Sequence, residues 1–215
     1  MEYRSMPRYA NSDLSQFRDQ LLGLPARKPS TAALVFGTLF HSLTLEQQPP
    51  TGINPKLDVQ LIAMRDSVMQ CDFARNAIQT GRVELVQTWE DELTGLPCKG
   101  KLDIWCDRDE TIVDLKSTSA RSYGEFLKCC EDYDYDRQAA FYLDGNPFAK
   151  RFVIIGVQKT APFQVFYFEA TAARGCIEMG RKKYGALLRD IERFGFTPTS
   201  WDKKAVYLQP LSQAA

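Results

Sequence analysis

The sequence has 215 residues, of which 44% are hydrophobic and 25% charged, and these values are typical of a globular protein with one domain. Its 27 Lys and Arg residues balance its 27 Asp and Glu residues, which excludes a protein that holds polyanions through net charge alone. His41 is the one histidine, so a metal site built from several histidines of one chain is also excluded.

The first 80 residues favour helices. Ser12 or Asn11 can cap a helix that ends near position 22. Ser30 can cap a strongly apolar helix that ends near position 46, and because its apolar residues nearly surround it, we expect a central, buried helix. One helix or two short ones follow over 56–79, and Gly81 ends this stretch.

From position 82 onward, strand patterns and helix patterns alternate. The sequence predicts strands at 82–92, 97–105 and 111–116, followed by helices at 123–130 and 135–144. Two more strands, at 151–158 and 163–169, then precede a long helix at 171–194 that is capped by Thr171. Thr94-Gly95 marks a turn, so the first three strands form an antiparallel meander. A tail begins at about 197. This order predicts one mixed α/β (α+β) domain with a central mixed sheet flanked by helices.

The cellular setting is predicted from two absences in the sequence. No apolar stretch resembles a signal peptide or reaches the length of a membrane-spanning helix. The six cysteines form no C-x-x-C pair, which favours reduced thiols. We therefore expect a cytoplasmic protein that does not enter a membrane.

Charged residues on the second and third strands suggest a metal site. Asp114 and Lys116 are two apart and share a face, and the short loop before them brings Asp103 close. Buried carboxylates are costly unless they bind something, and Mg²⁺ prefers oxygen ligands such as these and the Leu115 carbonyl. The alternative is a structural salt bridge among Asp103, Asp114 and Lys116, and the spacing leaves both interpretations open.

Two further segments extend this pattern, GTLFHSLTLE at 37–46 and DYDYDRQAAFYLDG at 132–145. The motifs follow one another in a fixed order: a helix with G-x-x-x-H, then D and D-x-K on adjacent strands, then Q-x-x-x-Y. This order resembles the PD-(D/E)XK nuclease superfamily. Within it, the order is similar to the RecE (exonuclease VIII) branch, which is related to lambda exonuclease and the RecB nuclease domain. The resemblance covers about 12–185.

The resemblance implies a role for each matching residue. His41, Asp103, Asp114 and the Leu115 carbonyl would bind metal, and Lys116 would be the catalytic lysine. Gln138 and Tyr142 would support the lysine and contact a substrate phosphate, and their spacing puts them on one helix face. The implied cofactor is Mg²⁺, with two ions, for which Mn²⁺ can substitute.

The same resemblance implies a function. The protein would be a metal-dependent 5′-to-3′ double-stranded DNA exonuclease. It would release 5′-mononucleotides and leave 3′ overhangs for phage-type recombination by single-strand annealing. A homo-oligomeric ring, trimer or tetramer, and a partner annealing protein are also implied. An endonuclease of the same superfamily and a non-catalytic DNA-binding or assembly protein on a nuclease scaffold remain alternatives.

Further residues are candidates for DNA or metal contact. Those near the ends of the motif segments suit a terminal 5′-phosphate: Arg27, Lys28, Ser30, Ser117 and Arg121. Glu84, Glu90 and Glu92 fall on the first strand at even positions and would share a face. One of them can approach the metal site, as in lambda exonuclease, or all three can form a solvated face.

Overall fold

The computed structural model describes residues 3–25, 31–50, 52 and 54–201. Five strands form one sheet in the order β1-β2-β3-β4-β5. Their bounds are β1 Arg82–Glu90, β2 Pro97–Cys106, β3 Thr111–Thr118, β4 Arg151–Gln158 and β5 Val165–Glu169. The β1–β2, β2–β3 and β4–β5 pairs are antiparallel, which confirms the predicted meander. The β3–β4 pair is parallel, so the sheet is mixed.

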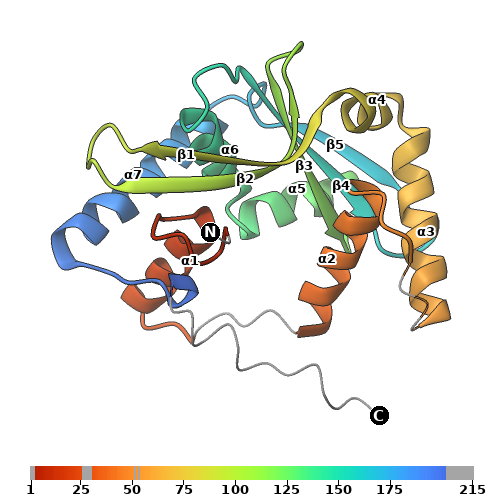
Figure 1. Cartoon of the computed structure of the whole chain (residues 1–215), viewed down its shortest axis with the longest axis horizontal. Coiled ribbons are helices and arrows are strands. Elements are labelled where there is room, and N and C mark those ends of the chain that lie inside the picture. The colour runs from red at the N-terminus through yellow and green to blue at the C-terminus, as the bar shows by residue number, and fades with distance from the viewer. Residues whose placement is uncertain (1–2, 26–30, 51, 53, 202–215) are drawn as a thin grey trace.

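Helices cover both faces of the sheet, as Figure 1 shows. They are α1 Asn11–Leu21, α2 Thr31–Thr44, α3 Pro55–Gln70, α4 Asp72–Thr80, α5 Tyr123–Asp132, α6 Tyr135–Asp144 and α7 Cys176–Phe194. One core joins α2, α3 and α4 to one face, where Val113, Leu115 and Val153 point. A second core joins α5 and α6 to the other face, where Ile112 and Phe152 point. The predicted single mixed domain is thus confirmed.

The expectation that the second helix is buried throughout is wrong for its first half. Leu34 is 55% exposed and Val35 is 48% exposed, whereas Phe40 is fully buried. Figure 1 shows why, because the start of α2 projects beyond the sheet and only its last turns reach the strands. The buried end of α2 is the part that carries His41.

Two predicted boundaries near the C-terminal end also change. Thr171 does not cap the long helix, because α7 begins at Cys176 after Gly175, and the Thr171 hydroxyl instead accepts a hydrogen bond from Phe152 N. The first part of the predicted tail, up to Trp201, packs against the domain. That indole packs on Tyr9, with ring centroids 4.9 Å apart, and donates a hydrogen bond to Arg8 O.

The β2 strand separates from β3 in its first half, and this separation opens the sheet. The β2–β3 ladder runs only from Cys106↔Thr111 to Ile104↔Val113. Closer to its start, β2 pairs with β1 on one side and meets the N-terminal segment on the other. There Tyr9 N donates to Pro97 O, and Lys99 N donates to Tyr9 O. The open region between β2 and β3 is therefore bounded by the N-terminal segment.

Two further sequence predictions concern thiols and membranes. All six cysteines are free thiols, including the adjacent Cys129 and Cys130. Within the described ranges, none of the helices combines the length and apolar character needed to cross a lipid bilayer.

Candidate active site

Three carboxylates lie in a row across the first three strands. Asp103 faces Asp114 one step beyond the last β2–β3 ladder pair, Ile104↔Val113. On its other side Asp103 faces Glu84, which lies between the Val83↔Ile104 and Leu85↔Leu102 pairs. Residues that face each other on antiparallel strands point to the same side of a sheet. The register therefore gathers three acids where β2 leaves β3.

Glu84 has an unusual backbone for a strand residue. Its φ is +54°, in the left-handed region that non-glycine residues rarely adopt. Such conformations cost of order 1–3 kcal/mol and concentrate at functional sites. The distortion interrupts the ladder at Glu84, whose carboxylate lies close to His41 and Asp103.

His41 reaches this cluster from the end of α2. Its Nε2 lies 2.8 Å from Leu115 O, and its Nδ1 lies 3.7 Å from Asp103 Oδ1. If Nε2 carries the proton and donates to Leu115 O, the Nδ1 lone pair faces the carboxylates. Asp103 Oδ2 accepts a hydrogen bond from Leu115 N at 2.8 Å. Two predicted ligands, His41 and Asp103, are thus both fixed to the Leu115 peptide.

Asp114 is the most buried member of the site. Lys116 Nζ lies 2.8 Å from Asp114 Oδ2 and 3.0 Å from Oδ1, and Gln138 Nε2 donates to Oδ1 at 2.8 Å. Burial raises the pKa of Asp114 to about 6, although the positive charge of Lys116 opposes this rise. Burial alone would lower the pKa of Lys116, but Asp114 and Asp103 outweigh it and raise that pKa above its usual range. Lys116 is therefore an ammonium held against a buried carboxylate.

The donor set fits a hard divalent cation. Ligand atoms of His41, Glu84 and Asp103 all lie within 4.8 Å of one another. Asp114 Oδ2, next to them in the register, is buried and accepts no well-aligned hydrogen bond in the described structure. Carboxylate oxygens with one imidazole nitrogen suit Mg²⁺ or Mn²⁺. Lys101 Nζ forms an ion pair with Glu84 and neutralises part of this negative charge.

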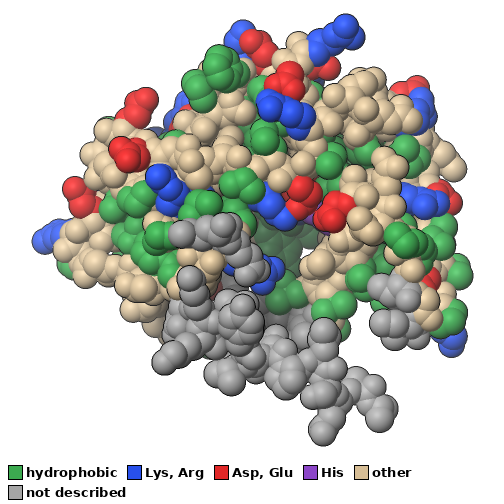
Figure 2. All heavy atoms as spheres, in the orientation of Figure 1, with side chains coloured by type: hydrophobic (Ala, Val, Ile, Leu, Met, Phe, Trp, Pro, Cys, Tyr) green, Lys and Arg blue, Asp and Glu red, His purple; other side chains and the backbone are tan. Residues whose placement is uncertain are grey.

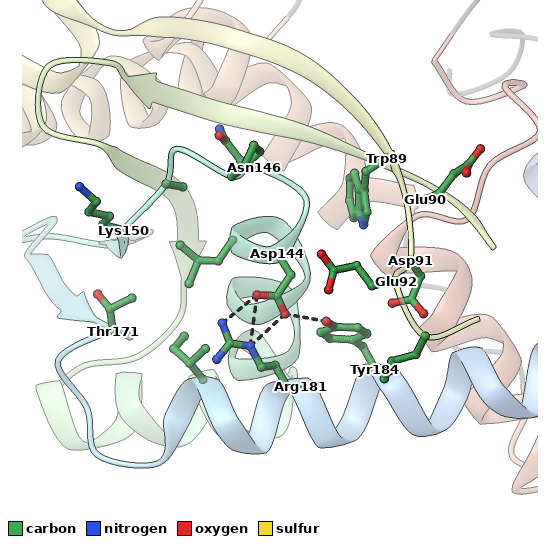
Figure 3. Close-up of a pocket in the computed structure, with 15 residues that line it drawn as sticks. Trp89, Glu90, Asp91, Glu92, Asp144, Asn146, Lys150, Thr171, Arg181 and Tyr184 are labelled. Carbon is green, nitrogen blue, oxygen red and sulfur yellow. Dashed lines mark hydrogen bonds and ion pairs between the residues drawn. The ribbon is translucent and has the colours of Figure 1, made fainter. Parts of the chain in front are cut away.

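Glu90 and Glu92 lie elsewhere, which corrects the prediction that all three glutamates share a strand face. β1 ends at Glu90, and Glu92 belongs to the following turn. Both line a separate cavity of about 660 Å³ between the β1–β2 turn and α7. Figure 3 shows this cavity, where the Asp144 carboxylate accepts hydrogen bonds from Arg181 and Tyr184. Only Glu84 of the three approaches the metal-ligand cluster.

The remaining predicted residues differ in position. Gln138 and Tyr142 lie on one face of α6, as predicted, and line a cavity of about 840 Å³ beside the carboxylates. Figure 2 shows a hollow in the middle of this side of the molecule, with acidic and basic side chains at its edge. Ser117 is half-buried at the end of β3 and Arg121 is exposed before α5. Arg27, Lys28 and Ser30 lie outside the described residues.

Sequence reasoning undervalued Glu84 and did not identify Lys101 or Tyr135. The Tyr135 ring centroid lies 5.2 Å from Lys116 Nζ, so this ring shields the lysine. The hairpin register was the signal that could have identified Glu84. Once the turn at Asp91 to Leu96 is fixed, Glu84 must face Asp103.

Replacing Glu84 with glutamine should weaken divalent-metal binding, because a neutral amide is a poorer ligand for a hard cation. We expect the dissociation constant for Mn²⁺, measured by calorimetry, to rise about tenfold or more. Glu90→Gln is the matched control, since Glu90 is exposed at the other cavity, and its affinity should equal that of the parent. Equal affinities for the Glu84 and Glu90 variants would remove Glu84 from the ligand set.

Comparison with known proteins relates this arrangement to a described family. Residues 53–195 match the model of a PDDEXK-like domain of unknown function (DUF3799). A candidate exonuclease from Eubacterium rectale has a similar solved structure, with a TM-score of 0.63, 16% identity, and coverage of 97% of this chain and 91% of that one. A phage-related exonuclease from Haemophilus somnus gives a TM-score of 0.45 at 12% identity, covering 86% and 94%. The likeness to the Eubacterium rectale protein concerns the fold. No curated protein matches the sequence.

Proposed function

The chain belongs to the family of PDDEXK-like domains, and from this premise we propose that it is a divalent-metal-dependent nuclease that hydrolyses phosphodiester bonds in DNA. One observation supports this most strongly. Glu84, Asp103 and Asp114 align across three strands, and Lys116 is paired with the last of them. A structural salt bridge would explain Asp114 and Lys116, but it would leave the clustering of Glu84, Asp103 and His41 without a cause.

The residues divide the chemistry among themselves. A divalent cation at the site would neutralise charge on the scissile phosphate and make a bound water more acidic. Glu84, Asp103, Asp114 and His41 would hold it. The Lys116 ammonium provides a fixed positive charge that stabilises the developing negative charge of the phosphate. Gln138 holds the Asp114 carboxylate in place through Oδ1, and Leu115 holds Asp103 and His41.

The finer part of the proposal is a 5′-to-3′ exonuclease of double-stranded DNA that leaves 3′ overhangs for single-strand annealing. It rests on the sequence resemblance to the RecE branch. A ring of three or four subunits, an annealing partner protein and a cytoplasmic location belong to the same proposal. The contacts of Ser117 and Arg121 with a 5′-phosphate are also part of it, since both lie just beyond Lys116 in the chain.

A digestion assay tests this function directly. Linear duplex DNA with 5′-phosphates is incubated with the protein and either Mg²⁺ or EDTA. We expect 5′-mononucleotides only with Mg²⁺, digestion of a 5′-labelled strand from its labelled end, and resistance of closed circles. Asp114→Asn serves as the inactive control. Cleavage of circles would show an endonuclease instead, and the absence of metal-dependent cleavage on all substrates would contradict a nuclease.

A further inference from the structure

A buried lysine fastens the N-terminal segment next to the site. Lys99 on β2 is only 1% exposed. Its ammonium donates to the carbonyls of Tyr3, Arg4 and Met6 at 2.9, 3.0 and 2.9 Å. An ammonium has three protons, and burying it is costly unless all three are accepted. Because one short segment supplies all three acceptors, the structure specifies where residues 3–9, here called the strap, must lie.

The strap forms one wall of the cavity beside the carboxylates. Tyr3 and Arg4 line this cavity together with Lys101 and Gln138. Gln138 is hydrogen-bonded to Asp114, and Lys101 is paired with Glu84, so the cavity adjoins the catalytic cluster. Figure 1 shows the strap, in red, beneath β1 and β2. A substrate at the carboxylates would therefore contact the strap.

The charge of this cavity suits a phosphate. Arg4 is exposed, and its guanidinium has no ion-pair partner among the residues that the structure describes. Asp13, the acid among the described lining residues, is buried and accepts hydrogen bonds from Ala10 N and Ser200 Oγ. Both oxygens of this carboxylate thus accept hydrogen bonds from the protein itself. Arg4 is left as a cation that can bind a backbone phosphate.

The cavity lining also includes aromatic rings. Tyr133 and Tyr135 both line it, with ring centroids 5.9 Å apart and planes 25° from parallel. Tyr133 is 60% exposed, so it can stack on a further ring. A cationic side chain combined with an exposed aromatic ring is the arrangement by which proteins hold single-stranded nucleic acid without reading its sequence.

We propose that the cavity between the strap and Tyr133 is a nucleotide subsite, in which Arg4 binds a backbone phosphate of the substrate strand and Tyr133 stacks on its base. This proposal rests on the proposed nuclease function. It specifies that the base at this position is unstacked from at least one neighbour, as at a strand end, since a base inside a duplex has both faces covered. Lys99 is a positioning residue that acts through the strap.

The test measures binding of a short single-stranded oligonucleotide by fluorescence anisotropy, with Ca²⁺ in place of Mg²⁺. We expect Arg4→Ala to weaken binding about tenfold and to reduce the slope of log affinity against log salt by about one. Tyr133→Ala should weaken binding about tenfold and leave the slope unchanged. Arg108→Ala is the matched control, because Arg108 is an exposed arginine on the β2–β3 loop, and binding should equal that of the parent.

Further measurements separate this subsite from the chemistry. Arg4→Ala should reduce hydrolysis of DNA more than hydrolysis of bis(4-nitrophenyl) phosphate, a diester without a nucleotide. Lys99→Met should reproduce the weaker oligonucleotide binding and accelerate amide exchange in residues 3–9. Arg4 and Tyr133 are exposed, so their variants fold even if the Lys99 variant does not.

If the parent cleaves neither DNA nor the small diester, the nuclease proposal fails, while oligonucleotide binding still tests the subsite. Binding by Arg4→Ala equal to that by Arg108→Ala would overturn the subsite.

Discussion

Replacing Lys116 with alanine should reduce nuclease activity about a thousandfold, a loss that corresponds to about 4 kcal/mol of transition-state stabilisation. The reason is geometric. The ammonium is fixed within 3.0 Å of both Asp114 oxygens and shielded by Tyr135, so water cannot replace its charge in the same position. Digestion of linear duplex in Mg²⁺ measures the effect. Lys128→Ala should leave activity unchanged, because that side chain is 72% exposed and, within the described part of the chain, its ion pair is with Asp132.

The loss must be separated from misfolding, because removing Lys116 leaves the Asp114 carboxylate buried without its ion pair. We expect this to lower the melting temperature of the Lys116→Ala protein. The double variant Lys116→Ala with Asp114→Asn removes the uncompensated charge and should recover part of that stability while staying inactive. Parental activity in Lys116→Ala, with the same metal dependence, would show that Lys116 has no part in the chemistry.

The sequence predicted the part of the site that depends on local patterns. Asp103 and Asp114 meet because a short loop folds β2 onto β3, and a side-chain period of two then aligns Lys116 with Asp114. Gln138 and Tyr142 follow from helical spacing in the same way. These predictions need only the register of one hairpin and the turn of one helix, and both are set by nearby residues.

The rest depended on contacts that no local pattern encodes. The hairpin register places Glu84 opposite Asp103, but no glycine in the sequence marked the left-handed backbone at Glu84. The strap is held by Lys99, more than 90 positions away in the sequence, so its place is fixed only by the tertiary fold. The apolar start of α2 suggested burial, but composition does not reveal that the helix projects beyond the sheet.

Two glycines on α7 should respond in opposite ways to alanine, and the contrast tests how α6 is positioned. A Cβ at Gly180 would lie 2.1 Å from Asp136 O and 2.8 Å from Ala140 Cβ, so the two helices touch through their backbones there. A Cβ at Gly185 would meet only Arg189 Nη1, the end of a flexible side chain, at 3.6 Å. The same substitution on the same helix therefore creates a clash at one position and fills open space at the other.

We expect Gly180→Ala to lower the free energy of unfolding by about 3 kcal/mol, because neither backbone can move without disturbing the core. In a chain of this length the melting temperature should fall by roughly 6–12 °C. Gly185→Ala should raise stability by up to about 1 kcal/mol, since alanine favours helix more than glycine does. Thermal denaturation followed by circular dichroism measures both.

The Gly180 substitution should also affect the site, because the helix that it displaces carries Gln138. A shift of α6 would lengthen the 2.8 Å hydrogen bond from Gln138 to Asp114 and release the buried carboxylate from one of its constraints. Nuclease activity of Gly180→Ala, assayed well below its melting temperature, should therefore fall, whereas that of Gly185→Ala should not. Equal stability and activity in the two variants would show that α6 and α7 are not in backbone contact at Gly180, and that the position of Gln138 is set by other contacts.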